Sequence, residues 1–144
     1  MFDIIIAEDE QTLSECLRMR EEVFVHEKKV DPNIERDEND ILGGECEHFL
    51  ITEDGESIGA LRCTPLYDTV YLQRFCVLRD RRRNGAGRMV MQLIEKYYKT
   101  LGIEKIELDA KCSSQEFYEN CGYKVISERF VEADVLHVKM LKEI

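Results

Sequence analysis

The sequence predicts an α/β fold in which a mixed central sheet of about six to seven strands carries helices on both faces. Short apolar segments rich in β-branched residues recur along the chain, and longer segments show the helical spacing of apolar residues. Turns rich in glycine, proline and aspartate separate these segments. The resulting order is strand, helical region, three strands, helix, strand, helix and two strands, which is the pattern of a mixed sheet with helices on both faces.

The N-terminal part of the chain is expected to form a strand and a long helical region. Asp9 can cap the helix, because apolar side chains recur at helical spacing from Leu13 to Phe24. The turn signal Asp31-Pro32-Asn33 then ends this part. The expected elements are a strand at residues 2–7, a helical region from residue 9 to 28 or 29, and a charged loop at residues 35–40.

The rest of the chain alternates strands with two further helices. Gly102 is placed to end the first of these helices, and Gly122 to end the second, which Ser113 or Ser114 can cap. The expected elements are strands at residues 47–52, 57–64, 70–78 and 104–110, helices at residues 85–101 and 113–121, and a closing strand pair at residues 123–128 and 135–140.

Composition limits the possible functions. The chain is long enough to bury a core, and we expect one domain over residues 1–144. A net charge of −10 argues against a nucleic-acid partner, because binding a phosphate backbone needs a broad basic face. No apolar segment approaches the length of a membrane span, so no membrane partner is expected.

The N-terminus and the cysteines indicate a cytoplasmic protein. The first residues lack the basic start and the long apolar stretch of a secretory signal. Six cysteines are scattered without any Cys-x-x-Cys pair, so we expect reduced thiols, with neither a disulfide scaffold nor a metal site.

An arginine-rich segment from Arg79 to Arg88 stands out in so acidic a chain. It contains Gly85 and Gly87, follows an expected strand and begins an expected helix. Free backbone N–H groups, the positive end of a helix dipole and guanidinium groups would meet there, which predicts a phosphate-binding site. The segment lacks the Gly-Lys-Ser/Thr of a P-loop and the third glycine of a dinucleotide fingerprint. An unrelated nucleotide-binding protein that uses the same loop remains an alternative.

Two motifs together resemble the GNAT superfamily, the Gcn-five-related N-acetyltransferases. That family carries a Gln/Arg-x-x-Gly-x-Gly/Ala loop after its fourth strand, which here is Arg82 to Gly87. It also carries an aromatic-Tyr-x-x-x-Gly-Phe/Tyr segment near its C-terminus, which here runs from Phe117-Tyr118 to Gly122-Tyr123. The order of the coarse elements matches over nearly the whole chain.

A narrower resemblance links the chain to the ElaA-type bacterial branch of that superfamily. It rests on the segment Leu17–Glu27, on Asp37 and Glu47-His48, and on Asp134–His137. Lys28 stands where that branch usually has Gln.

The resemblance implies acetyl-CoA as the donor and co-substrate, with no metal. Backbone amides from Arg83 to Arg88 would bind the pyrophosphate with help from arginine side chains, among which Arg82, Arg83 and Arg88 are the best candidates. The pantetheine arm would pair with the central strand, and an amide N–H at or near Cys76 would polarise the thioester carbonyl. The cofactor-binding residues expected are Phe75, Cys76, Val77, Arg82, Arg83, Asn84, Gly85, Ala86, Gly87 and Arg88.

Tyr118 matches the family position that serves the departing thiol, and a phenol can supply the proton that this thiol needs.

The sequence does not identify the general base. Gln73 stands where related chains often have Glu, and a glutamine side chain cannot take a proton. The candidates for the base and the acceptor site are His48, His137, Glu22, Glu47 and Asp109. Arg20 would either reach the acceptor pocket or pair with the acidic run at residues 35–40, which we interpret as a solvated loop.

The sequence and the resemblance together indicate a GNAT-type acyl-CoA N-acyltransferase that moves an acetyl group from acetyl-CoA to an amine by direct attack. The acceptor would be a small-molecule amine or a protein amine, and a homodimer is compatible with the fold. The alternative is a non-catalytic acyl-CoA-binding regulatory module on the same fold, which Gln73 keeps open.

Overall fold

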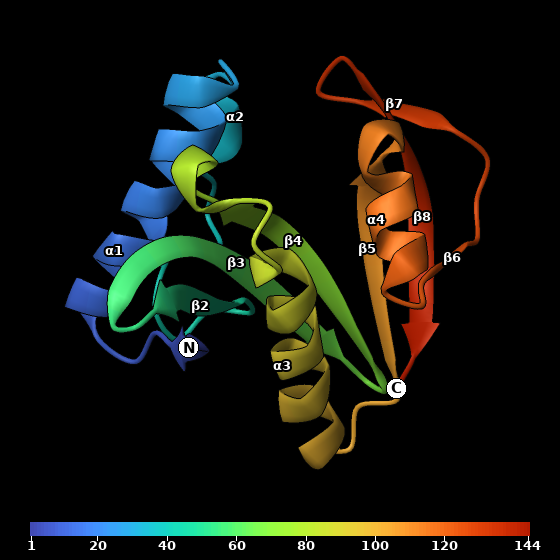
Figure 1. Ribbon diagram of the computed structural model, residues 1–144, viewed down its shortest axis with the longest axis horizontal. Helices are drawn as coiled ribbons and strands as arrows, with labels where there is room; N and C mark the ends of the chain where they lie inside the picture. The colour runs from blue at the N-terminus through green and yellow to red at the C-terminus, as the bar shows by residue number, and fades with distance from the viewer.

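A central mixed sheet of eight strands organises the molecule, and the computed structural model describes all of residues 1–144. Its strand order is β1-β2-β3-β4-β5-β8-β6, and β7 pairs with β8 (Figure 1). The strands are β1 (Phe2–Ile6), β2 (Glu47–Glu53), β3 (Glu56–Leu66), β4 (Thr69–Val77), β5 (Lys105–Lys111), β6 (Lys124–Val125), β7 (Phe130–Glu132) and β8 (Val135–Glu143). The helices are α1 (Glu10–Arg20), α2 (Pro32–Glu35), α3 (Ala86–Thr100) and α4 (Gln115–Asn120), with a π-helix η1 (Glu21–Glu27) and 3-10 turns η2 (Arg79–Arg81) and η3 (Cys112–Ser114).

The two faces of the sheet pack against different helices. Phe49 and Ile51 of β2 belong to the large core that covers the α3 side. Leu50, between them, belongs to a smaller core with Cys16 and Met19 of α1. Successive side chains of a strand point to opposite faces, so this one strand contributes to both cores. The expected arrangement, with helices on both faces, is confirmed.

The first helical region has the expected extent and an unexpected form. Asp9 caps α1, and its carboxylate accepts a hydrogen bond of 2.7 Å from the backbone N–H of Thr12. The chain then continues as the π-helix η1 as far as Glu27. A π-helix widens the turn and often marks a functional site. Here it directs Val23 and Phe24 toward the centre of the molecule.

The parallel strands β4 and β5 pair only at their N-terminal ends. Thr69–Leu72 lie beside Lys105–Leu108, and beyond Leu72 the two strands separate into a V (Figure 1). On its other edge β4 carries a bulge, where Arg74 adopts a left-handed φ of 56°. One extra residue between two paired positions bends a strand and increases its twist. The bulge therefore lies at the level where β4 leaves β5.

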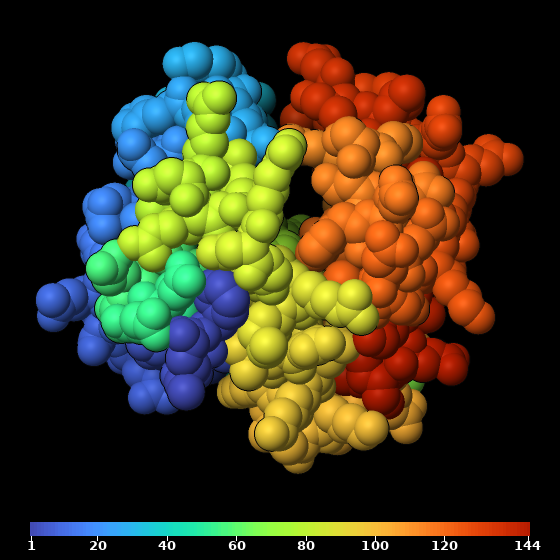
Figure 2. All heavy atoms as spheres, in the orientation of Figure 1, coloured from blue at the N-terminus to red at the C-terminus, as the bar shows by residue number.

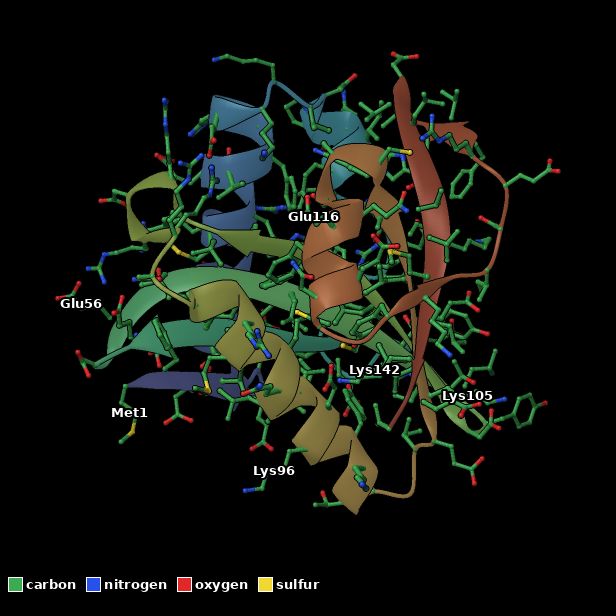
Figure 3. The ribbon with its side chains drawn as sticks, turned by 45° about the vertical axis from the view of Figure 1, so that its right-hand side comes forward. Met1, Glu56, Lys96, Lys105, Glu116 and Lys142 are labelled. Atoms are coloured by element: carbon green, nitrogen blue, oxygen red, sulfur yellow. The ribbon has the colours of Figure 1, made fainter.

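The C-terminal segment lies along the outer edge of β5, away from β4 (Figure 1). Lys142 of β8 lies between α3 and the end of α4 (Figure 3), donating to Glu95 and to the Cys121 carbonyl, each at 2.8 Å. The expected closing strand pair is present as β6 and β8, and the three-residue β7 is an addition. None of the helices combines the length and hydropathy that a membrane crossing requires.

Candidate active site

A cavity of about 1190 Å³ occupies the gap between β4 and β5. Its walls come from η1, α2, β4, the loop before α3, β5, η3, α4 and the β7–β8 turn. Figure 2 shows its opening as a hollow between the segment that leads into α3 and the orange α4. A single space therefore extends along the unpaired edge of β4.

The start of α3 presents free backbone amides at one end of this cavity. Gly85 takes a left-handed φ of 86° and begins the helix without a side-chain cap. The first backbone bond of the helix runs from Met89 N–H to the Gly85 carbonyl, so the N–H groups of Gly87 and Arg88 have no acceptor in the protein. Asn84 Oδ1 receives only a long bond of 3.3 Å from Ala86 N–H. Unpaired amides at a helix N-terminus are suited to binding an anion.

Arg82 does not present a free guanidinium to a phosphate. It forms a two-pronged ion pair with Glu27 of η1, at 2.8 and 2.6 Å, and its Nε donates to the Val77 carbonyl at 2.8 Å. Arg81 is likewise paired, with Glu53 and Glu56. The side chain of Arg82 therefore fixes the loop against η1.

Arg83 and Arg88 form no ion pair. Arg83 lines the main cavity together with Ala86 and Gly87. Arg88 instead lines a smaller pocket of about 110 Å³ beside it. Of the three arginines that the sequence suggested for phosphate binding, these two keep free guanidinium groups.

Gly87 lies directly beneath an aromatic ring of α4. A Cβ added at Gly87 would meet the Phe117 ring at 2.9 and 3.1 Å. Phe117 also contacts Tyr118 edge-on, with ring centroids 5.0 Å apart. The absence of a side chain at Gly87 thus lets α4 approach the start of α3 while the channel stays open.

The C-terminal half of β4 provides a lining for an extended ligand. Phe75, Cys76 and Val77 all line the cavity, and β5 supplies them no ladder partner. Burial raises the pKa of the Cys76 thiol to about 12, so this cysteine is a small apolar wall residue at neutral pH. An extended chain could pair with this edge as an added strand does.

Tyr118 lines the same cavity, opposite β4. Its ring packs edge-on against Tyr123 at 5.9 Å, and its hydroxyl has no hydrogen-bond partner within the protein. Burial raises the pKa of the phenol, which therefore keeps its proton at neutral pH. A protonated, unpaired hydroxyl is suited to donate to an anion in the cavity.

His137 also reaches the cavity, from β8. Its Nδ1 lies 2.8 Å from the Val135 carbonyl, to which it must donate, so a neutral ring carries a free lone pair on Nε2. The ring stacks on Phe130, and Glu132 Oε2 lies 3.7 Å from Nε2. These contacts orient a nitrogen that can accept a proton.

His48 is placed away from the cavity. It is buried, and its Nε2 bonds to the Asn39 carbonyl at 2.9 Å. Burial lowers its pKa, which keeps the ring neutral. The structure therefore does not bring His48 together with Tyr118 and His137.

The carboxylates suggested from the sequence have separate positions. Glu47 accepts a bond of 2.6 Å from the Tyr98 hydroxyl of α3 and does not line the cavity. Glu22 is exposed beside His26. Asp109 alone lines the cavity, where it pairs with Lys139 at 3.1 Å.

The acidic run at residues 35–40 is not a solvated loop, which corrects our interpretation. Glu35 is 2% exposed and the Asp40 side chain 5%, because both bind the fully buried Arg20. Asp37 and Asp40 also hold the buried Arg62, at 2.7 and 2.9 Å. Arg20 therefore pairs within this cluster and does not line the cavity.

Glu35 lines the cavity, and our sequence reasoning missed it. The sequence did contain a signal for this residue. Arginines lie on two elements that were expected to be buried, and a buried arginine needs a carboxylate nearby. Charge spacing alone could not show which carboxylate of the run faces inward.

Comparison with known proteins agrees with this geometry. A family model of the acetyltransferase (GNAT) domain matches residues 7–144. The Bacillus subtilis protein YjcF, described as an uncharacterized N-acetyltransferase, is 34% identical over 140 residues, which are 96% of this chain and 98% of YjcF.

Two crystal structures share the fold over nearly their full lengths. An acyl-CoA N-acyltransferase from Pseudomonas aeruginosa has a TM-score of 0.83 and 25% identity, with 99% of each chain covered. Escherichia coli ElaA has a TM-score of 0.79 and 25% identity, with 99% of this chain and 100% of ElaA covered. The resemblance found in the two motifs is thereby confirmed, and the chain belongs to the GNAT acetyltransferase family as an N-acyltransferase of that type.

Proposed function

We propose that the protein transfers an acetyl group from acetyl-CoA to an amine. The observation that carries this proposal is the continuity of the cavity. One space joins the free amide of Gly87 to the unpaired edge of β4 and to the Tyr118 hydroxyl. A diphosphate at one end, an extended arm along the strand and a thioester near the phenol would fit this sequence of groups.

Donor binding would rest mainly on backbone groups. The amides at the start of α3 and the side chains of Arg83 and Arg88 would hold the pyrophosphate. Phe75, Cys76 and Val77 would flank the pantetheine arm. Arg82 would act indirectly, because its pair with Glu27 keeps the loop in the shape that exposes the amides.

The reaction would proceed by direct attack of the amine nitrogen on the thioester carbon. The C–N bond forms as the C–S bond breaks, and the leaving sulfur takes a proton from Tyr118. His137 Nε2 would accept the proton that the amine nitrogen loses, and water would carry that proton from His137 back to the Tyr118 phenolate. Gln73, which also lines the cavity, can only donate or accept a hydrogen bond here.

The experiment measures donor binding and product formation separately. Calorimetric titration with CoA tests the binding site, and mass spectrometry of an amine panel incubated with acetyl-CoA tests transfer. Binding together with an N-acetylated product supports the proposal. Binding of CoA without any acetylated amine would favour the alternative, a regulatory acyl-CoA-binding module.

The remaining aspects of the proposal concern context. We infer that residues 1–144 act as one acetyltransferase domain on a small-molecule or protein amine. Six unpaired thiols are compatible with work in the reducing cytoplasm, and a homodimer is compatible with the fold. Size-exclusion chromatography with light scattering would measure the oligomeric state.

A further inference from the structure

One buried carboxylate oxygen lacks a donor. Glu35 ends the short helix α2, and its Oε2 accepts from Arg20 Nε at 2.9 Å and lies 3.3 Å from Arg74 Nε. Its Oε1 is buried and has no hydrogen-bond partner. Buried polar atoms are nearly always hydrogen-bonded, so an unpaired carboxylate oxygen calls for a partner that binds there.

The position of Glu35 indicates where that partner comes from. Glu35 lines the same cavity as Gln73, Arg74 and Cys76 of β4. Arg74 Nε of β4 donates to the backbone carbonyl of Glu35 at 3.3 Å, so the end of α2 contacts this strand directly. Glu35 therefore lies beside the stretch of β4 that would flank the thioester.

The charges around Glu35 balance without a ligand. Arg20 of α1, Arg62 of β3 and Arg74 of β4 face Glu35, Asp37 and Asp40, so three cations meet three carboxylates. Both buried arginines already have their carboxylate partners. The group missing at Oε1 is thus a hydrogen-bond donor rather than a compensating charge.

The wall next to Glu35 is apolar. Val23 and Phe24 of η1 line the cavity together with Val30, which precedes α2, and Ile34, which belongs to α2. The carbonyl of Phe24 accepts a bond of 2.8 Å from Val30 N–H, which ties these two parts of the wall together. Ile34 is 57% exposed at the rim. A ligand that reaches Glu35 would lie along this surface.

We propose that Glu35 Oε1 accepts a hydrogen bond from the acceptor nitrogen and that the preferred acceptor is a primary amine on an apolar stem. This inference rests on the proposed function. The carboxylate would bind the N–H of the amine beside β4, while η1 and the α2 region would cover its aliphatic chain. Glu35 would then be an acceptor-binding residue, with its effect on the KM for the amine.

The test combines an amine series with two variants. Wild-type protein is assayed with acetyl-CoA and ethylamine, butylamine or hexylamine, and with spermidine as a polar comparison. The KM should fall about three- to fourfold for each methylene that enters the apolar wall. Glu35→Gln keeps the shape of the side chain and should raise the KM for hexylamine about 10- to 100-fold, with the KM for acetyl-CoA unchanged.

Asp37→Asn is the matched control. It removes a carboxylate from the same cluster, bound to Arg62 and outside the cavity lining, and should leave the KM for hexylamine within about twofold. A folded Glu35→Gln protein with the wild-type KM for hexylamine would overturn the inference.

If Glu35→Gln does not fold, the KM values of the wild-type protein for the amine series test the inference. A KM that is independent of alkyl length, or transfer to spermidine but not to hexylamine, overturns this inference alone and leaves the proposed function standing. Failure of acetyl transfer to every amine overturns the proposed function and the inference with it.

Discussion

Replacing Gly87 by leucine should weaken CoA binding about 10- to 100-fold while the protein stays folded. A Cβ added at this position would lie 2.9 Å from the Phe117 ring, closer than carbon atoms normally approach. Alanine needs only a small movement of Phe117, which is 36% exposed and can yield. Leucine adds three further carbons, so the ring must move into the channel or the new side chain must fill it.

The magnitude can be worked out from this contact. Overpacking costs about 1–3 kcal/mol, and replacing a helical glycine by a good helix former returns about 0.8–1 kcal/mol. The net loss of unfolding free energy is about 0–2 kcal/mol, or a fall in Tm of about 0–8 °C for a chain of this size. Losing access to one amide that binds a charged phosphate should weaken CoA binding about 10- to 100-fold.

Thermal unfolding and calorimetric titration with CoA separate the two effects. Gly87→Ala is the matched control, and it should keep both the Tm and CoA binding near the wild-type values. If folded Gly87→Leu protein bound CoA with wild-type affinity, the start of α3 would not be the diphosphate site.

Three further predictions concern other parts of the molecule. Tyr118→Phe should lower kcat about 100-fold with unchanged CoA affinity, because the unbonded hydroxyl contributes to proton transfer and not to packing; steady-state kinetics with an unaltered kcat would contradict the acid role. Glu27→Gln should weaken CoA binding about three- to tenfold by releasing Arg82; calorimetry showing no change would mean that the loop holds its shape without this pair. Burial favours protonation of Asp40, but hydrogen bonds from Arg20 outweigh it and lower the pKa of this carboxyl from 3.8 to about 2. The ionised carboxylate therefore stabilises the fold above pH 3.8, and this contribution is lost as the pH falls toward 2. Urea unfolding should therefore show a stability gap between wild type and Asp40→Asn that narrows over this range, and a constant gap would refute the linkage.

Local patterns along the chain were sufficient for most of the elements and for the helix start that we propose as the donor site. Alternating apolar residues give β2 its two buried faces, and Asp9 caps α1 as its position suggests. Gly85 and the free amides that follow it lie within a few consecutive residues. Such features depend on neighbours in sequence, where spacing translates directly into geometry.

Partners distant in the sequence were settled only by the folded chain. Arg82 lies in the phosphate motif, yet its guanidinium forms an ion pair with Glu27, which is 55 residues away in the sequence. His48 and His137 are equally plausible from their strand positions, but only His137 faces the cavity. Glu35 became a buried cavity residue because arginines from α1 and β4 converge on it. Ion pairing and burial depend on which elements pack together, and one-dimensional spacing does not carry that information.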